Sequence, residues 1–344
     1  MYEDHFGLTD RPFALTPDPR FWVDTSTHRK AMSYLGYGLA QGEGFIVITG
    51  DIGAGKTTLV GHLVGRIDPA RITVLKIVST AVEADDLLRT VASGLGIEGE
   101  GLSKAELLTR IERGLQAVAR TGRRTLLIVD EAQALPVSAL EELRMLSNFQ
   151  SGGQAMLQIL MLGQPEFRER LTGSDRLEQL RQRVIATHHL DPMGVDEVET
   201  YIAHRLQVAG WQGRPDFADD SFAAIHRASG GVPRRLNQLM GRVLLHAALA
   251  GVELIDAAVI DTVAGDAERE VAAPAPKPVE AVAVPPSDAA APAPAVALAP
   301  AIEARVERLE ARIEELDGAL RRVLTLLVDW VEGDARADQV RGAA

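Results

Sequence analysis

Residues 50–57 read Gly50-Asp51-Ile52-Gly53-Ala54-Gly55-Lys56-Thr57 and match the pattern G-x-x-x-x-G-K-[ST]. The glycines allow the backbone to curl so that several N–H groups point at one phosphate group. The apolar run Phe45–Thr49 leads into this stretch, and a helical pattern at 57–67 leads out of it. The pattern requires this strand–loop–helix context, so the sequence predicts a phosphate-binding loop.

Each residue type in the loop has a role in binding a nucleotide. Lys56 is expected to place its charge on the β- and γ-phosphates of ATP, and Thr57 to supply a hydroxyl ligand to Mg²⁺. The helix that follows adds the positive end of its dipole. We therefore expect ATP and Mg²⁺ to bind, with contacts from Gly50, Asp51, Ile52, Gly53, Ala54, Gly55, Lys56, Thr57 and Thr58. The alternative is a glycine-rich turn without a ligand.

A second motif, Thr125–Glu131, is an apolar run that ends in two acids. A carboxylate at the C-terminal end of a parallel strand lies at the ligand crevice. We expect Asp130 to hold Mg²⁺ through water and Glu131 to polarise the attacking water as general base. Alone, the pair could cap a helix. Together with the phosphate-binding loop upstream, it indicates hydrolysis rather than nucleotide binding alone.

Strand and helix patterns alternate along the first half of the chain. The apolar runs are Phe45–Thr49, Ile72–Val78, Thr125–Asp130, Leu157–Leu162 and Val184–Leu190, with helical patterns at 57–67, 84–95, 103–121, 137–150 and 165–182. Such alternation predicts an α/β domain over residues 1–192, with a parallel sheet covered by helices on both faces. Helical patterns alone follow at 195–210, 219–229, 234–250 and 256–264, which predicts an all-helical lid at 193–267.

The last part of the chain differs in composition. Residues 268–300 are rich in Ala, Pro and Val, which predicts a disordered, semi-rigid linker. Residues 301–332 carry apolar side chains at spacings that alternate between four and three, from Ile302 to Trp330. This heptad pattern predicts a coiled-coil helix, which associates with itself or with another protein; the alternative is a helix that folds back on the globular part. Residues 333–344 are expected to be a disordered tail.

Two polar residues are candidates for sensing the nucleotide. Gln164 follows the run Leu157–Leu162 and could reach the γ-phosphate or the attacking water. The alternative is that it caps the helix starting at Pro165. Arg234 follows Pro233 at the start of a lid helix and could lean over the γ-phosphate. Proline at a first helical turn is also ordinary helix-start chemistry.

Two arginines, Arg181 and Arg183, precede the last strand of the α/β domain. An arginine at this position could project into the ATP site of a neighbouring subunit, which would make hydrolysis depend on assembly. Arg183, directly before the strand, is the preferred candidate. The alternative is a surface arginine on the flank of a helix.

Composition limits the class of protein. The chain has 344 residues, 46% of them hydrophobic, and a formal net charge of −12, which argues against a protein that coats nucleic acid. The absence of cysteine excludes disulfides and thiolate metal sites. The N-terminus lacks the pattern of a signal peptide, and no apolar stretch is long enough to span a membrane. We expect a cytoplasmic protein that reaches the inner membrane only peripherally, through a partner.

The order of these motifs resembles the AAA+ superfamily, and more closely the ATPases of the ExeA / general secretion pathway protein A family. The resemblance covers residues 1 to about 265. Its motifs are Tyr2 with Phe6–Leu8 and Pro12–Phe13, Thr16–Pro19, Gly42–Phe45 with Gly50–Thr58, Val129–Gln133, Leu162–Glu166, Leu180–Arg183 and Gly231–Asn237. The N-terminal block and residues 42–58 look especially like the subfamily associated with exosortase (PEP-CTERM) and exopolysaccharide loci.

The resemblance implies an ATPase whose hydrolysis helps to assemble envelope or secretion machinery. Its partners would be a second copy of the chain, in a ring or through the coiled coil, and protein components of an exopolysaccharide or secretion export system. The same core also resembles transposition-regulator ATPases that coat DNA, a role that the acidic composition disfavours. A third reading is a nucleotide-switched adaptor with little turnover that acts through the heptad segment.

Overall fold

The computed structural model describes residues 2–16, 18–78 and 83–272. The chain divides into a compact unit, Met1–Ala273, and the remainder, Pro274–Ala344. The predicted coiled coil at 301–332, the tail and most of the predicted linker lie outside the described residues. The linker was expected to begin at 268, but the last helix, α12 (Ala257–Ala272), extends through that position.

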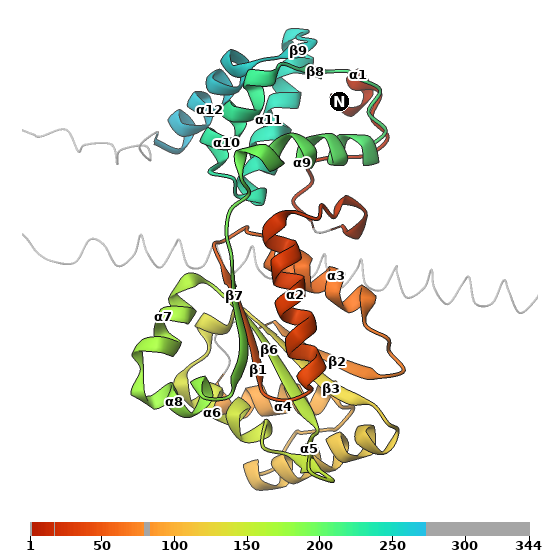
Figure 1. The fold of residues 1–344 in the computed structure, drawn as a ribbon, viewed down its shortest axis with the longest axis vertical. Coiled ribbons are helices and arrows are strands. Elements are labelled where there is room, and N and C mark those ends of the chain that lie inside the picture. The colour runs from red at the N-terminus through yellow and green to blue at the C-terminus, as the bar shows by residue number, and fades with distance from the viewer. Residues whose placement is uncertain (1, 17, 79–82, 273–344) are drawn as a thin grey trace, which may run out of the picture. The chain divides into compact units, whose positions relative to one another are not determined.

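A five-stranded sheet forms the centre of the α/β part. Its strands are β1 (Phe45–Gly50), β2 (Ile72–Val78), β3 (Arg124–Asp130), β6 (Leu157–Gly163) and β7 (Val184–Leu190), in the order β2-β3-β6-β1-β7 (Figure 1). All neighbouring pairs are parallel. The five predicted strands and the predicted parallel sheet are therefore confirmed. Because the strands are parallel, the residues that follow β1, β3 and β6 meet at one edge of the sheet.

Helices cover both faces of the sheet, as predicted. The face that carries Ile46 and Ile48 packs against α2 (Ser26–Gln41) and α3 (Lys56–Arg66). The face that carries Phe45 and Val47 packs against α4 (Ala84–Gly94), α5 (Lys104–Arg120), α6 (Val137–Leu146) and α7 (Pro165–Gly173). Successive residues of β1 thus enter two separate apolar cores, as expected from the two-residue repeat of a strand.

The helical lid has its own apolar core. It contains α9 (Val195–Val208), α10 (Asp219–Ser229), α11 (Pro233–Ala250) and α12. Two two-residue strands, β8 (Asp216–Phe217) and β9 (Leu254–Ile255), pair in parallel inside it, so the lid is not entirely helical as predicted.

The N-terminal segment belongs to the core of the lid rather than to that of the α/β part. Phe6, Leu8 and Phe13 are buried against lid helices. Phe6 ends α1 (Tyr2–Phe6), which is drawn in red beside the lid helices in Figure 1. The predicted α/β domain at 1–192 included this segment. The structure differs because three apolar side chains so close to the N-terminus have no position in the sheet and are buried in the lid instead.

Three helical patterns end at different places from those predicted. The pattern at 165–182 is broken into α7, a 3-10 turn η3 (Asp175–Leu177) and α8 (Glu178–Arg181), because Ser174 is extended. The pattern at 137–150 ends with α6 at Leu146 and is followed by the short hairpin β4 (Gln150–Ser151) and β5 (Gln154–Ala155). The pattern at 256–264 is the first half of α12.

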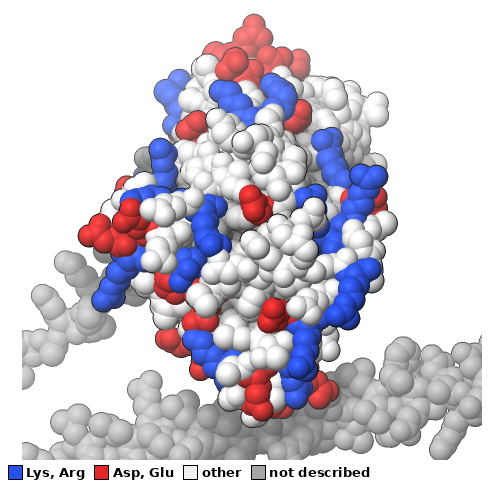
Figure 2. Space-filling model, turned by 60° about the horizontal axis from the view of Figure 1, so that its bottom comes forward, with Lys and Arg blue, Asp and Glu red and all other residues white. Residues whose placement is uncertain are grey.

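Two properties of the described residues bear on partners. None of their helices has the length and apolar character needed to cross a membrane. On the face shown in Figure 2, basic and acidic side chains lie among one another with uncharged residues between them. Along the right-hand edge of that face, several basic side chains follow one another.

Candidate functional site

The phosphate-binding loop connects β1 to α3. Gly53 and Gly55 have positive φ angles of 86° and 94°, which glycine adopts without steric cost. Lys56 is the first residue of α3, and its Nζ donates hydrogen bonds to the backbone oxygens of Gly50 (2.6 Å) and Asp51 (2.9 Å). The Lys56 ammonium group therefore lies inside the loop, at the N-terminal end of a helix, where an anion binds.

Burial lowers the pKa of Lys56, while the carboxylates of Glu131, Asp130 and Asp51 act in the opposite direction. The side chain is almost fully buried. Placing an ammonium group out of water costs free energy unless an anion or hydrogen-bond acceptors compensate it. A phosphate group at the loop would supply that anion.

Thr57 and Asp130 lie together at the same edge of the sheet. The hydroxyl group of Thr57 donates to Oδ2 of Asp130 across 3.2 Å, although the residues are 73 positions apart. A hydroxyl and a carboxylate are oxygen ligands of the kind that Mg²⁺ takes together with water and phosphate oxygens. This donor set fits Mg²⁺. Among the residues that the structure describes, no group of three or more acidic or histidine side chains gathers to hold a metal.

Glu131 has an unusual backbone conformation. Its φ is +54°, and it is the one non-glycine residue of the described part with a positive φ. Its backbone N–H donates to Oδ1 of Asp130 (3.0 Å). A non-glycine residue in this conformation is uncommon and is frequently found at functional sites. The backbone turn directs two consecutive carboxylates differently, one toward Thr57 and one toward the amides described next.

Two glutamine amides hold the carboxylate of Glu131. Oε2 accepts hydrogen bonds from Nε2 of Gln133 and from Nε2 of Gln164, the latter at 3.3 Å. The backbone N–H of Gln164 donates to Oε1 of Gln133 (3.1 Å), which completes a triangle. Gln164 therefore lies beside the predicted general base. We did not single out Gln133 from the sequence; its position two residues after an acidic pair at a strand end is the signal that could have found it.

Arg234 is the second residue of the lid helix α11 and lies next to the phosphate-binding loop. Its backbone N–H donates to the oxygen of Gly53 (3.2 Å). A Cβ atom added at Gly53 would lie 2.4 Å from Cβ of Arg234, so a side chain at position 53 would displace the lid helix. Residues 181 positions apart in sequence are thus in contact, and the loop is connected directly to the lid.

A cavity of about 300 Å³ extends from the loop into the lid. Lys56, Thr57, Glu131 and Arg234 line it, together with residues that the sequence analysis did not single out as site residues: Ala14, Leu15, Phe21, Trp22, His28, Tyr201, Arg205 and Asn237. They come from the N-terminal segment, α2 and two lid helices. No local pattern marks them, because they converge only when the chain folds.

His28, on α2, supports the loop from one side. Burial lowers its pKa to about 4, so its ring is neutral at pH 7. Nδ1 is hydrogen-bonded to the hydroxyl group of Thr25 (2.7 Å), and Trp22 packs against the ring, with centroids 4.8 Å apart. A Cβ atom added at Gly55 would lie 2.9 Å from Nε2 of His28, so the loop and the histidine are in close contact.

Arg181 and Arg183 lie away from this cavity. Arg183 directly precedes β7, at the edge of the sheet opposite the loop, and donates to the hydroxyl group of Ser147 (3.1 Å). Arg181 donates to the backbone oxygen of Thr172 (2.9 Å). Both side chains are exposed. Neither reaches the nucleotide site of its own chain, a placement that fits both a residue that acts on a neighbour and the alternative of a surface arginine.

The fold and the loop define a P-loop domain of the AAA class. Residues 39–171 match the family model described as AAA domain. Among curated proteins, the chain is 35% identical over 252 residues to General secretion pathway protein A of Aeromonas hydrophila. The match covers 73% of this chain and 46% of that protein, so the chain spans about half the length of the curated relative that it matches. The chain is thus similar in sequence to that protein and contains a region that matches the AAA domain.

Solved structures show the same fold at low sequence identity. The ADP form of the ORC2 protein of Aeropyrum pernix is similar with a TM-score of 0.56 and 17% identity, over 78% of this chain and 75% of that chain. Cdc6p of Pyrobaculum aerophilum is similar with a TM-score of 0.57 and 16% identity, over 72% of this chain and 68% of that one. At this level of identity the similarity establishes the fold alone.

Proposed function

We propose that the chain binds ATP with Mg²⁺ at the phosphate-binding loop and hydrolyses it. The observation that carries the proposal is the convergence of Lys56, the Thr57–Asp130 pair and Glu131 at one edge of the sheet. A lone glycine-rich turn would need none of these partners. The match of residues 39–171 to the AAA domain and the sequence similarity to General secretion pathway protein A add independent support.

Different residues of the chain would bind the phosphates, hold the metal and activate the water. Backbone N–H groups of the loop and the ammonium group of Lys56 bind the β- and γ-phosphates and neutralise their charge. Thr57 and Asp130 hold Mg²⁺, which supplies positive charge to the phosphate oxygens. Glu131 accepts a proton from the attacking water. For this the Glu131 carboxylate must exchange an amide partner for water, and Gln164 is placed to orient that water.

The lid would close the site. Arg234 is in place to approach the γ-phosphate, because its backbone already contacts Gly53. In an assembled ring, Arg183 of one chain would complete the site of a neighbouring chain. Arg181 is the second candidate for this role. Both arginines are exposed, which such a contact requires.

We further propose that this hydrolysis serves the assembly of an export system in the cell envelope, for secreted protein or exopolysaccharide. The similarity to General secretion pathway protein A supports this role. The chain would act from the cytoplasmic side as an oligomer, and would reach the membrane through a protein partner. ATP-bound protein should then retain that partner longest.

Steady-state phosphate release from Mg²⁺–ATP tests the proposed activity. Lys56→Ala removes the main counter-charge for the phosphates, so ATP affinity should fall at least ~100-fold and turnover should be lost. Lys76→Ala is the matched control, because Lys76 is exposed on β2. Turnover by the Lys56→Ala protein at the wild-type rate would refute a site at this loop.

The proposed role in export is tested by partner capture. The Glu131→Gln protein, loaded with ATP, should retain envelope components from a lysate of its own host, and ADP-loaded protein should release them. Capture of the same proteins in both nucleotide states would argue against a hydrolysis-driven assembly role.

A further inference from the structure

A buried arginine in the lid forms no ion pair with the described acidic residues, although the charge of Asp18 acts on it from a distance. Arg205, on α9, is 8% exposed, yet none of the carboxylates in the described part of the chain forms an ion pair with it. Asp18, which lines the same cavity, is instead paired with Arg20 at 2.6 Å. A buried charge without a counter-charge costs several kcal/mol unless hydrogen bonds or a ligand compensate it.

Three groups hold the Arg205 guanidinium in place. Nε donates to the backbone oxygen of Pro12 (2.5 Å), and Nη1 donates to the hydroxyl group of Tyr201 (3.0 Å). The aromatic rings of Phe21 and Tyr201 lie 5.0 Å and 5.5 Å from Cζ. The Tyr201 hydroxyl group in turn donates to Oδ1 of Asn237 (3.0 Å). The arginine is thus oriented by the N-terminal segment and by both lid helices that line the cavity.

One nitrogen of the guanidinium has both of its N–H groups available. Among the described residues, Nη2 of Arg205 has no hydrogen-bond partner, while Arg205 lines the cavity that begins at the phosphate-binding loop. None of its partners belongs to residues 50–58, nor is any of them Asp130 or Glu131. The free donor therefore lies in the cavity but outside the set of groups that bind phosphate and metal.

We propose that Arg205 contacts the nucleoside part of the bound nucleotide, by donating from Nη2 to an acceptor on the base or ribose. This inference rests on the proposed ATP site. It makes Arg205 a specificity-determining residue that connects the nucleoside to the N-terminal segment through Pro12 and to α11 through Tyr201 and Asn237. Arginine suits the position because its planar guanidinium holds its donors in a fixed fork, whereas the three donors of an ammonium group are carried on a flexible stem.

Calorimetric titration of the full chain with ATP and with inorganic tripolyphosphate separates the nucleoside contact from the phosphate contact. Arg205→Lys keeps the charge and loses the fork, so affinity for ATP should fall roughly tenfold or more, as for loss of one hydrogen bond from a charged donor. Affinity for tripolyphosphate, which has neither base nor ribose, should stay within a factor of about two. Lys56→Ala should weaken the binding of both ligands. Failure of the proposed ATP site can therefore be distinguished from failure of the Arg205 contact alone.

Two further variants control for a purely structural role. Arg20→Lys changes another arginine that lies over Phe21, at 5.6 Å, but that does not line the cavity, and it should leave both affinities unchanged. Tyr201→Phe keeps the ring and removes only the hydroxyl anchor, and it should weaken ATP binding without changing tripolyphosphate binding. Equal losses for the two ligands in the Arg205→Lys protein, or no loss for ATP, would overturn the proposal.

Discussion

At the scale of single residues, the site is organised around the carboxylate of Glu131. In this structure the carboxylate is engaged by the amides of Gln133 and Gln164 rather than free to face the loop. A general base must be within hydrogen-bond reach of the water that it deprotonates. In the proposed mechanism, binding of ATP would therefore have to rearrange these two amides.

Gln164 can be tested apart from nucleotide binding. Gln164→Ala removes the amide that lies at the end of β6, and turnover should fall about 100-fold, as when one positioned polar group is lost from an active site. ATP affinity should change little, because the loop and Lys56 are untouched. Gln182→Ala is the matched control: its amide also donates to a glutamate, Glu178, but on the surface of α8. Comparable losses in both proteins would contradict a role for Gln164.

The residues of the loop and of Asp130–Glu131 could be located from the sequence, because each belongs to a short pattern with a fixed chemical reason. Gln133 has such a signal as well, because it lies two positions after Glu131. His28 and Arg205 could not be located, because they reach the cavity from segments that are distant in sequence. A pattern read along the chain does not report such convergence.

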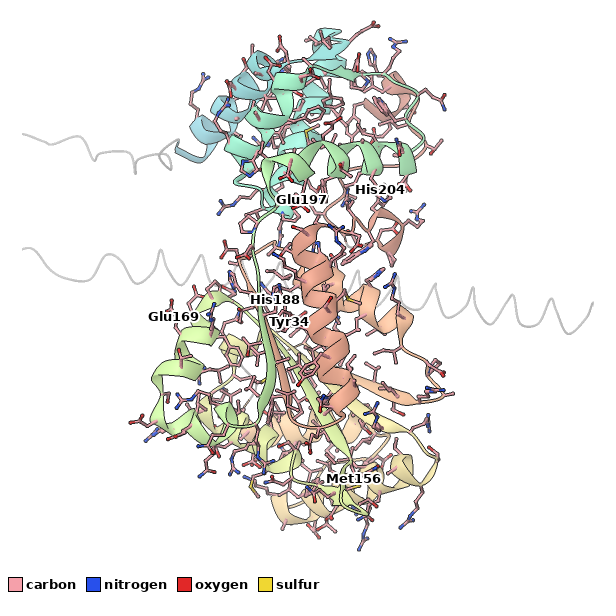
Figure 3. All side chains as sticks on the ribbon, viewed as in Figure 1. Tyr34, Met156, Glu169, His188, Glu197 and His204 are labelled. Atoms are coloured by element: carbon pink, nitrogen blue, oxygen red, sulfur yellow. The ribbon has the colours of Figure 1, made fainter. Side chains whose placement is uncertain are left out.

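At the scale of helices and strands, the lid and the α/β part are joined by one acidic side chain. Glu197, in the first turn of α9, accepts from the backbone N–H of Ser26 (2.6 Å) at the start of α2 and from the backbone N–H of Gly194 (3.2 Å) at the start of its own helix. Figure 3 labels Glu197 at the end of α9 that faces α2. A carboxylate is favourable at a helix N-terminus, and here one carboxylate serves two helices.

Glu197→Ala should therefore destabilise the fold. Loss of both caps should lower the free energy of unfolding by about 1–2 kcal/mol, measured by urea denaturation. Glu199→Ala is the control, since Glu199 is exposed on the same helix and should change stability by less than about 0.5 kcal/mol. A Glu197→Ala protein as stable as the control would show that the contact with α2 contributes nothing.

The helix α2 also shows where sequence patterns fail. Its buried residues include Ala31, Leu35 and the glycine at position 38, a weak apolar stripe that did not stand out from the sequence. The structure makes its role clear, because a Cβ atom at Gly38 would lie 2.6 Å from the side chain of Ile46. The exposed Tyr34 on the same helix stacks on His188 of β7 (centroids 5.0 Å apart), and both are labelled in Figure 3.

At the scale of the whole molecule, the account depends on assembly. Arg183 lies outside the cavity of its own chain and is exposed, so any action on ATP must occur in a neighbouring subunit. Heterologous contacts of this kind arise in rings, where each subunit donates a residue to the next. The heptad segment at 301–332, outside the described residues, stays a prediction for a second means of association.

Mixing two inactive proteins tests this arrangement. Arg183→Ala should lower turnover about 10³-fold through loss of transition-state charge stabilisation. A random 1:1 mixture with the Glu131→Gln protein should recover activity, since about a quarter of the interfaces then join an intact Glu131 to an intact Arg183. The same mixture made with Arg181→Ala identifies which arginine is needed. No recovery with either variant would place the catalytic contacts within one chain.

Phosphate release from Mg²⁺–ATP by the Glu131→Gln protein, with ATP affinity measured in parallel, tests the hydrolytic assignment most directly. The amide keeps the shape of the carboxylate but cannot accept the proton of the attacking water. ATP affinity should therefore stay within a few-fold of wild type, while the rate of phosphate release should fall at least ~100-fold. Release at the wild-type rate would contradict the assignment of Glu131 as the general base.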